Sequence, residues 1–401
     1  MSSNPKLVTR VLLLAGSLIV ALGGAGLTWR RHVAHGKWQE ALVGIEQLEE
    51  RLNSRVVERV ALWGETNEGQ AQPYYDRALA AVEEWDAQAV MSISSETGEE
   101  GQAARRKLLH EGAGALADLH RGAHALDATH RVDWSRGFQI PMRTLLYVRV
   151  LTHISEMQAY ELIEEGQDLE AVRVLLDAMQ FAADQAGAPI LIEEMIGLAE
   201  LLPDILSDGL ADGSLMDLSP GAREELNAGV EIMNRRLGWR VASMEGELLL
   251  GVRGLEHVFK DGWTDSMERM MGQSIHPLQR LVLRDYAAEY VKFMASACQR
   301  VDAAHEMGLA HLARELNDLD NEAELFRNPI VAVLVPSLVS AYRSRLYSVG
   351  RLRLFLQALS GADHSVDPWL NTYLRRQPTE TGERLWMDHE LFGKLEVLVT
   401  H

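Results

Sequence analysis

The sequence predicts an all-α protein, in which a single N-terminal transmembrane helix precedes a multi-helix antiparallel bundle or an irregular solenoid-like array. Three observations predict this class. Residues 11–29 form an uncharged, mostly apolar run, which is long enough to cross a bilayer as a helix. Aromatic residues make up only 6% of the chain, and this scarcity favours helix over sheet. After the run, apolar residues recur at helical spacing, and we find no convincing strand pattern.

The apolar run divides the N-terminal region into three parts: a short tail (1–10), a predicted membrane anchor (11–29) and a juxtamembrane amphipathic helix (30–66). Lys6 and Arg10 precede the run, and Trp29-Arg30-Arg31 at its end suits a lipid headgroup layer. A cleaved signal peptide is the alternative, because Gly23-Gly24-Ala25 supplies the small residues that a peptidase prefers. The run stays uncharged for longer than a signal peptide needs, which favours the anchor.

Basic residues flank both ends of the anchor, so the distribution of positive charge does not orient it in the membrane. Short basic N-termini usually stay in the cytoplasm. We therefore expect a single-pass protein of the bacterial inner membrane, with its C-terminal domain in the periplasm. Cys298 is the single cysteine, so an internal disulfide is excluded, and cysteine usage does not distinguish the two compartments.

Beyond the juxtamembrane helix, we predict a soluble helical domain over residues 73–360 and an irregular C-terminal tail over residues 361–401. The link Gly166-Gln167-Asp168 is so short that the helices on either side must be antiparallel neighbours. Pro368 and Pro378 interrupt the tail. The predicted helices cover residues 74–91, 102–129, 142–165, 169–186, 189–202, 220 to about 260, 276–317 and 328–359.

The charge of the chain is strongly acidic, with a formal net charge of −19, which argues against nucleic acid as a partner. One window departs from this pattern, because no acidic residue lies between Glu324 and Asp363. The arginines in this window either pair with acidic helices of the same domain, or they bind an anionic surface or an acidic protein partner. The candidate binding residues are Arg343, Arg345, Arg351 and Arg353.

A metal site is one interpretation of His120 and His124, which lie four residues apart and therefore share one face of a helix. His110, Glu111, Asp127 and His130 are near them in sequence. Surface or helix-packing histidines are the alternative interpretation, and it needs no ion.

Two other metal patterns are incomplete. His305 and His311 lie six residues apart, so the second imidazole turns away from the first, unlike in the zinc-protease motif. The acidic group Asp318, Asp320 and Glu322 lacks the glycine and the distal glutamate of a calcium loop. We therefore predict a solvated acidic helix end at Asp318, Asp320 and Glu322.

Two local resemblances bear on the fold. Gly36–Ala41 and Gly166–Ala171 share a glycine followed by Glu-Ala at the same offset, which resembles the helix pairs of tetratricopeptide repeats. Residues 174–206 and 328–341 resemble segments of uncharacterised membrane-anchored helical proteins of the bacterial envelope. This second resemblance implies a helical fold and an envelope location, and it transfers no catalytic residues.

The chain carries no nucleophile elbow, phosphate-binding loop or dinucleotide-binding glycine pattern. We therefore expect no cofactor and favour a non-enzymatic role, that of a membrane-anchored scaffold or interaction protein of the cell envelope with a protein partner. The alternative is a ligand-binding or enzymatic helical domain whose pocket residues are scattered along the sequence.

Overall fold

The computed structural model describes most of the chain up to residue 325 and shorter stretches beyond it. Side chains are also left undescribed at residues 5–28 and at scattered positions within helices and strands. The helix predicted at 189–202, and Arg345, lie outside the described residues. The described residues are 5–93, 98–140, 145–185, 214–236, 242–261, 283–325, 328, 330–331, 339–340, 343, 347, 350–351, 353–355, 358, 366–367, 372–373, 375–380, 382–389 and 393–400.

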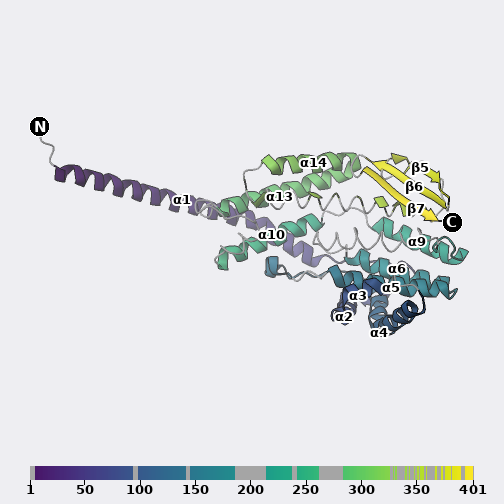
Figure 1. Cartoon of the computed structure of the whole chain (residues 1–401). Helices are drawn as coiled ribbons and strands as arrows, with labels where there is room; N and C mark the ends of the chain where they lie inside the picture. Colours follow the sequence, from purple (N-terminus) through teal and green to yellow (C-terminus); the bar gives the residue numbers. More distant parts are fainter. Residues whose placement is uncertain are drawn as a thin grey trace.

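The first helix, α1 (Pro5–Ser54), is one continuous helix of 50 residues. Its N-terminal part extends away from the rest of the chain, as Figure 1 shows. Its C-terminal part is buried along a stripe of helical periodicity, formed by Ala34, Trp38, Ile45, Leu48 and Leu52. Among the described residues, the structure contains no helix that is long and apolar enough to span a membrane. The side chains of the predicted anchor, 11–28, lie outside the described residues.

The predicted amphipathic helix ends earlier than expected, at Ser54 rather than near residue 65. The chain after Ser54 is extended and bonds to a strand-like segment far along the sequence. The amide of Arg59 donates to the carbonyl of Leu126 at 3.0 Å, and the amide of Ala128 donates to the carbonyl of Val57 at 2.9 Å. These long-range hydrogen bonds satisfy the backbone in place of further helical turns.

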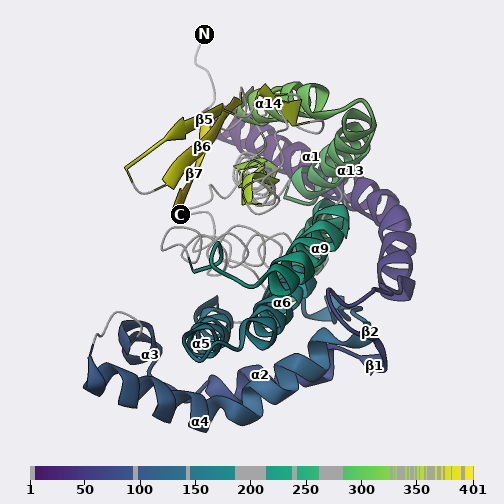
Figure 2. The same ribbon diagram turned by 90° about the vertical axis from the view of Figure 1, so that its right-hand side faces the viewer.

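The next five helices pack as a layered bundle, which Figure 2 shows from the side opposite the N-terminus. The single helix predicted at 74–91 is two helices, because Oδ1 of Asp86 accepts hydrogen bonds from the amides of Gln88 and Ala89 and starts a new helix. The five helices are α2 (Gln72–Val82), α3 (Ala87–Ile93), α4 (Glu99–Ala123), α5 (Leu145–Glu164) and α6 (Asp168–Gln185).

The antiparallel pair α5 and α6 confirms the expectation from the short link between them. Gly166 has φ of +74°, and its amide donates to the carbonyl of Ile163 at 2.9 Å while that of Gln167 donates to Leu162 at 2.8 Å. This is the arrangement in which a left-handed glycine ends a helix. Asp168 then begins α6 directly.

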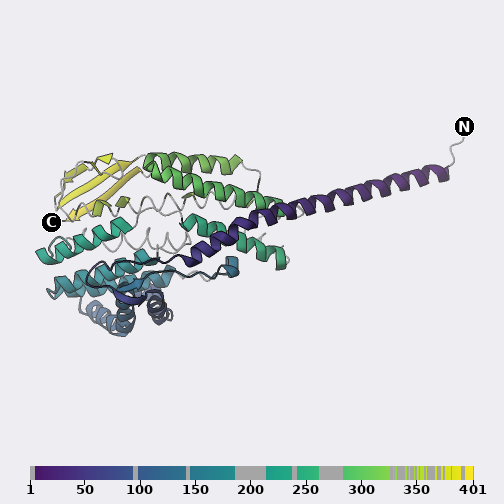
Figure 3. The same cartoon turned by 180° about the vertical axis from the view of Figure 1, so that it is seen from behind.

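Of the later helices, α9 packs against α6, whereas α10, α13 and α14 lie in the layer with the C-terminal part of α1 (Figure 3). Trp134 begins a 3-10 helix, η1 (Trp134–Gln139), which packs against α10. Gly137 has φ of +50°, and an added Cβ would meet the backbone of Gly254 at 2.7 Å, so only glycine fits there. The α-helices are α9 (Pro220–Arg236), α10 (Ala242–Asp261), α13 (Leu283–Glu306) and α14 (Leu309–Leu325).

The buried apolar side chains form two clusters. One lies among α2–α6 and α9, with Tyr75, Phe181 and Leu176 fully buried. The other lies among the C-terminal part of α1, η1, α10, α13 and α14, with Trp134 and Tyr290 fully buried. The mostly helical architecture is as predicted, and the C-terminal part of α1 contributes to the second cluster.

The C-terminal region contains strands in place of the expected irregular tail. In β7 (Gly393–Thr400), Leu395, Val397 and Val399 alternate with other residues, which is a period-2 pattern typical of a strand that we did not recognise. Three strands, β5 (Arg375–Pro378), β6 (Gly382–His389) and β7 (Gly393–Thr400), form a sheet in this order, and both of its strand pairs are antiparallel. Two further pairs of short strands are described: β1 (Asn67–Gln70) with β2 (Ala125–Asp127), and β3 (Val366–Asp367) with β4 (Thr372–Tyr373).

Candidate functional site

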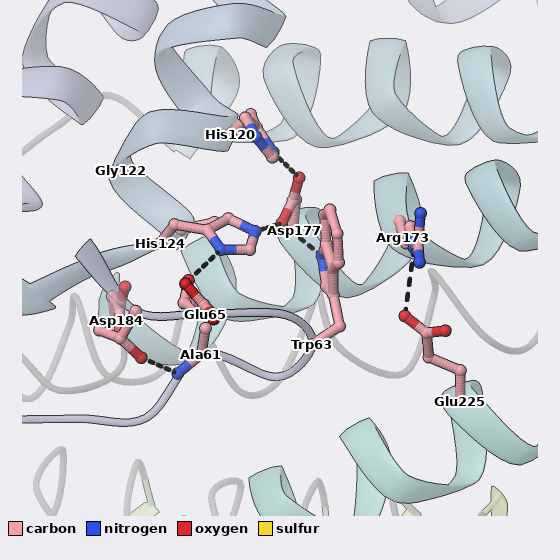
Figure 4. Close-up of polar contacts among 12 residues, drawn as sticks. Ala61, Trp63, Glu65, His120, Gly122, His124, Arg173, Asp177, Asp184 and Glu225 are labelled. Carbon is pink, nitrogen blue, oxygen red and sulfur yellow. Dashed lines mark hydrogen bonds and ion pairs between the residues drawn. The ribbon is translucent and has the colours of Figure 1, made fainter.

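The structure brings His120 and His124 together with Asp177, which lies 53 residues further along the chain. His120 is in the last turn of α4, and His124 is its C-cap residue. Asp177 is in the middle of α6, which packs against α4. The ligand-capable atoms of the three side chains lie within 4.8 Å of one another, and Figure 4 shows both imidazoles directed at the carboxylate.

The two imidazoles meet opposite oxygens of the Asp177 carboxylate. Nδ1 of His120 donates to Oδ2 of Asp177 at 2.7 Å. Nε2 of His124 lies 3.3 Å from Oδ1. The indole Nε1 of Trp63 also donates to Oδ1, at 2.8 Å. Asp177 is therefore the centre of the site, with three partners from two other segments of the chain.

A tight loop before β1 completes the site from a third direction. Gly64 has φ of +63°, and the amide of Ala61 donates to Oγ1 of Thr66 at 3.1 Å across the loop. This turn directs the Trp63 indole at Asp177 and the carbonyl of Glu65 at Nδ1 of His124, 2.9 Å away. Because a carbonyl can only accept, Nδ1 of His124 carries the proton.

The site is buried on one side and open on the other. His124 and Asp177 are each 5% exposed, whereas the side chain of His120 is 50% exposed. Burial lowers the pKa of His124. Its contacts with Asp177 and with the Glu65 carbonyl together raise the pKa by more than burial lowers it, so the net pKa lies above the usual value for histidine. The aromatic rings of Trp63 and His124 meet edge to face at 4.5 Å.

A second buried network fixes the helix end that carries the histidines. The guanidinium of Arg59 lies 3.0 Å from the carboxylate of Asp184, and both side chains are essentially inaccessible to solvent. Arg59 also donates to the carbonyls of Gly122 and Ala123. The hydroxyl of Tyr75 donates to Asp184 at 2.6 Å. Arg59 thereby satisfies carbonyls that the end of α4 leaves free.

The arrangement of His120, His124 and Asp177 permits two kinds of chemistry. Two imidazole nitrogens and a carboxylate oxygen can share one divalent metal ion. The same groups can instead share protons, as a buried carboxylate between two histidines. Sequence reasoning found the histidines and missed Asp177, although a carboxylate in the apolar stretch Leu-Leu-Asp-Ala-Met of α6 was the available signal.

The other acids and histidines near this pair in sequence do not join the cluster. Nε2 of His130 bonds to the carbonyl of Asp184 at 2.8 Å. Asp127 accepts a hydrogen bond from the amide of Thr129 at 2.8 Å. His110 and Glu111 are exposed on α4.

The arginine window makes internal contacts where it is described. Nη1 of Arg343 lies 3.4 Å from Oδ2 of Asp320 on α14, and its Nη2 donates to Asn317 at 2.6 Å. The guanidinium of Arg351 lies over the ring of Phe355, 5.6 Å from its centroid, and Arg353 also has partners. These contacts agree with the interpretation of internal pairing and leave the binding interpretation without direct support.

The structure also places the residues of the two metal patterns that the sequence analysis rejected. Gly308, with φ of +101°, ends α13 between His305 and His311. Asp318, Asp320 and Glu322 lie in the helix α14. Glu322 pairs with Arg300 of α13 at 2.7 Å.

Comparisons with protein-family models, with curated proteins and with solved structures find no match to this chain.

Proposed function

We propose that this protein is a membrane-anchored helical scaffold or interaction protein of the bacterial inner membrane, which presents its C-terminal helical body to a protein partner in the periplasm. The helical body is the part of the chain after residue 30. The observation that carries the proposal is the continuity of α1 from the apolar run at 11–29 into the second buried cluster.

The apolar run supports the anchor because its 19 residues span about 28 Å as a helix, close to the thickness of a bilayer core. The part of α1 that contains it extends away from the helical body (Figures 1 and 3). Trp29, at the end of the run, is 69% exposed. No other part of the chain that the structure describes covers most of this side chain, so it is free to contact lipid headgroups.

The junction of α1 with the helical body supports a role in presentation. Lys37 pairs with Asp285 of α13 at 2.6 Å, and Arg51 pairs with Glu245 of α10 at 2.8 Å. The buried stripe of α1 packs between the same helices. A helix held in this way transmits the orientation of the anchor to the body without a flexible linker.

Membrane fractionation of the full-length protein tests the anchor. We expect the protein to remain in the membrane pellet after alkaline carbonate extraction and its intact mass to include residues 1–29. Replacement of both Leu18 and Val20 by arginine should release it, because each charge is costly at the centre of a bilayer. The matched control is Val43→Arg, at an exposed position of α1, which should stay in the pellet.

A mature protein that begins after Ala25 would instead identify the run as a cleaved signal peptide and refute the anchor. Protease treatment of intact spheroplasts tests the orientation, because only a periplasmic body is digested. Crosslinking in those membranes tests for a stoichiometric partner. Recovery of the protein alone in every crosslinked sample would contradict the scaffold role.

A second function, that of a ligand-binding domain, is favoured by one observation. Two helices bring together three ligand-capable side chains, His120, His124 and Asp177, at a site that is buried on one side and exposed to solvent at His120.

A further inference from the structure

Nε2 of His124 is a buried nitrogen without a hydrogen bond. The nearest acidic oxygen, Oδ1 of Asp177, is 3.3 Å away. Because Nδ1 of His124 donates to the Glu65 carbonyl, the neutral imidazole presents a lone pair at Nε2. Two electron-rich atoms then face each other in a buried setting, which is unfavourable unless a cation lies between them.

A proton on Nε2 is one such cation, but the local geometry suits a metal ion better. The nitrogen and the oxygen are close enough for an electrostatic contact, but 3.3 Å is long for a hydrogen bond from an imidazolium to a carboxylate, which usually measures about 2.7–2.9 Å. Two ligand atoms at about 2.0–2.1 Å from a tetrahedral zinc ion lie about 3.3 Å apart. The 3.3 Å between Nε2 of His124 and Oδ1 of Asp177 matches that separation.

We propose that His120, His124 and Asp177 form a binding site for one divalent transition-metal ion, with zinc as the best match. Imidazole nitrogens combined with a carboxylate are typical ligands of zinc and of other late first-row metals. The ion would replace the proton that Nδ1 of His120 donates to Asp177, where the two atoms are 2.7 Å apart. His120 is half exposed, so its ring has room to open that distance by a few tenths of an ångström.

The groups around the three ligands have the pattern expected of a metal site. Zinc-bound histidines usually donate their second ring nitrogen to a carbonyl or a carboxylate, which fixes the tautomer. Nδ1 of His124 does so to Glu65, and Trp63 orients the carboxylate of Asp177. Within the part of the chain that the structure describes, Asp177 forms no ion pair with an arginine or a lysine, unlike buried Asp184, which pairs with Arg59.

The exposure of His120 also indicates what kind of metal site this is. Three protein ligands leave at least one coordination position of zinc for water or a small anion. That position would face solvent beside His120. The site therefore resembles an open zinc site more than a closed structural one. This inference does not depend on the membrane anchor, because all three ligands lie on α4 and α6 of the helical body.

Zinc titration of the full-length protein in detergent tests the site. The protein is stripped with a chelator and titrated with Zn²⁺ against a chromophoric competitor, and the bound metal is counted by elemental analysis. We expect one ion per chain. His120→Ala and Asp177→Asn should each weaken binding more than about 10-fold, by analogy with losses in other metal sites. The matched control is His110→Ala, an exposed histidine of the same helix, which should bind as the unmodified protein does.

Two results would overturn the proposal. The absence of zinc binding at micromolar concentration would identify the cluster as a proton-linked ion pair. Binding that is unchanged in both His120→Ala and Asp177→Asn would place the ion elsewhere. Because His120 is half exposed, His120→Ala should fold, and circular dichroism checks this. Co²⁺ gives an independent measurement, since a four-coordinate nitrogen and oxygen site produces visible absorption bands that His120→Ala should lose.

Discussion

The ring of Tyr75 packs directly on the backbone of Gly122, where an added Cβ would lie 2.4 Å from Cε1 of the tyrosine. Gly122 is between His120 and His124, and its carbonyl accepts a hydrogen bond from Arg59. The contact therefore joins α2 to the turn of α4 that carries both imidazoles. A residue with no functional group thus sets the position of two residues that have one.

Gly122→Ala should destabilise the protein, because the methyl group must displace a fully buried ring. Overpacking of this kind costs about 1–3 kcal/mol, and the better helix propensity of alanine offsets at most about 1 kcal/mol. Urea denaturation should therefore show a lower free energy of unfolding. The control is Gly114→Ala on the same helix, where no atom lies within 4 Å of the added Cβ. This control should be neutral or stabilising, and equal losses in the two variants would contradict the packing argument.

Trp63→Phe should weaken zinc binding about 10- to 100-fold, as loss of a group that orients a ligand does in other metal sites. Phenylalanine keeps the ring beside His124 but cannot donate to Asp177. Competition titration measures the affinity. Trp29→Phe, at an exposed site on α1, is the control and should leave zinc binding unchanged. An unaltered affinity in Trp63→Phe would show that the indole does not orient the carboxylate.

Asp184→Asn should cost about 3–5 kcal/mol of stability, because it leaves the buried guanidinium of Arg59 without its counter-charge. Asp118→Asn removes a comparable ion pair between α2 and α4, but its partner Arg77 is exposed, so the loss should be far smaller. Thermal and urea denaturation compare the two variants. Similar losses would mean that burial does not decide the strength of these pairs.

Cys298 should resist thiol reagents in the folded protein. It is 6% exposed within α13, and burial raises the pKa of its thiol to about 12. Since the folded pKa exceeds the unfolded value of 9.0, the neutral thiol favours folding fully below pH 9 and loses this contribution as the pH rises toward 12. Labelling with a chromogenic disulfide should be slow at pH 8 and accelerate in urea. Rapid labelling in native buffer would show that the second cluster opens easily.

Arg343→Glu distinguishes the two interpretations of the arginine window. If the pair with Asp320 is the role of Arg343, the reversal should lower stability by up to about 1 kcal/mol and leave crosslinks to a partner unchanged. If the surface binds an acidic partner, crosslinking should fall while the melting temperature is kept. Arg351→Glu, which removes a contact with Phe355, provides the comparison within the same window.

Helices of this chain were predictable where the signal is local. The short link at Gly166 predicted the antiparallel pair α5 and α6, because a left-handed glycine ends one helix and the next begins at once. The end of α1 was not predictable in this way, since the bonds that replace its next turns come from residues near Leu126. The C-terminal sheet could have been recognised from the alternation in β7, but β7 is short, Pro368 precedes the sheet and Pro378 lies within β5.

The sequence by itself determined the apolar run, the helical class and the four-residue spacing of His120 and His124, because each is a property of neighbouring residues. Only the tertiary structure decided what faces the histidines. Asp177 comes from another helix, and Trp63 and Glu65 come from a loop before both. A binding site needs groups that converge in space, and spacing along one helix places only those groups that the helix itself carries.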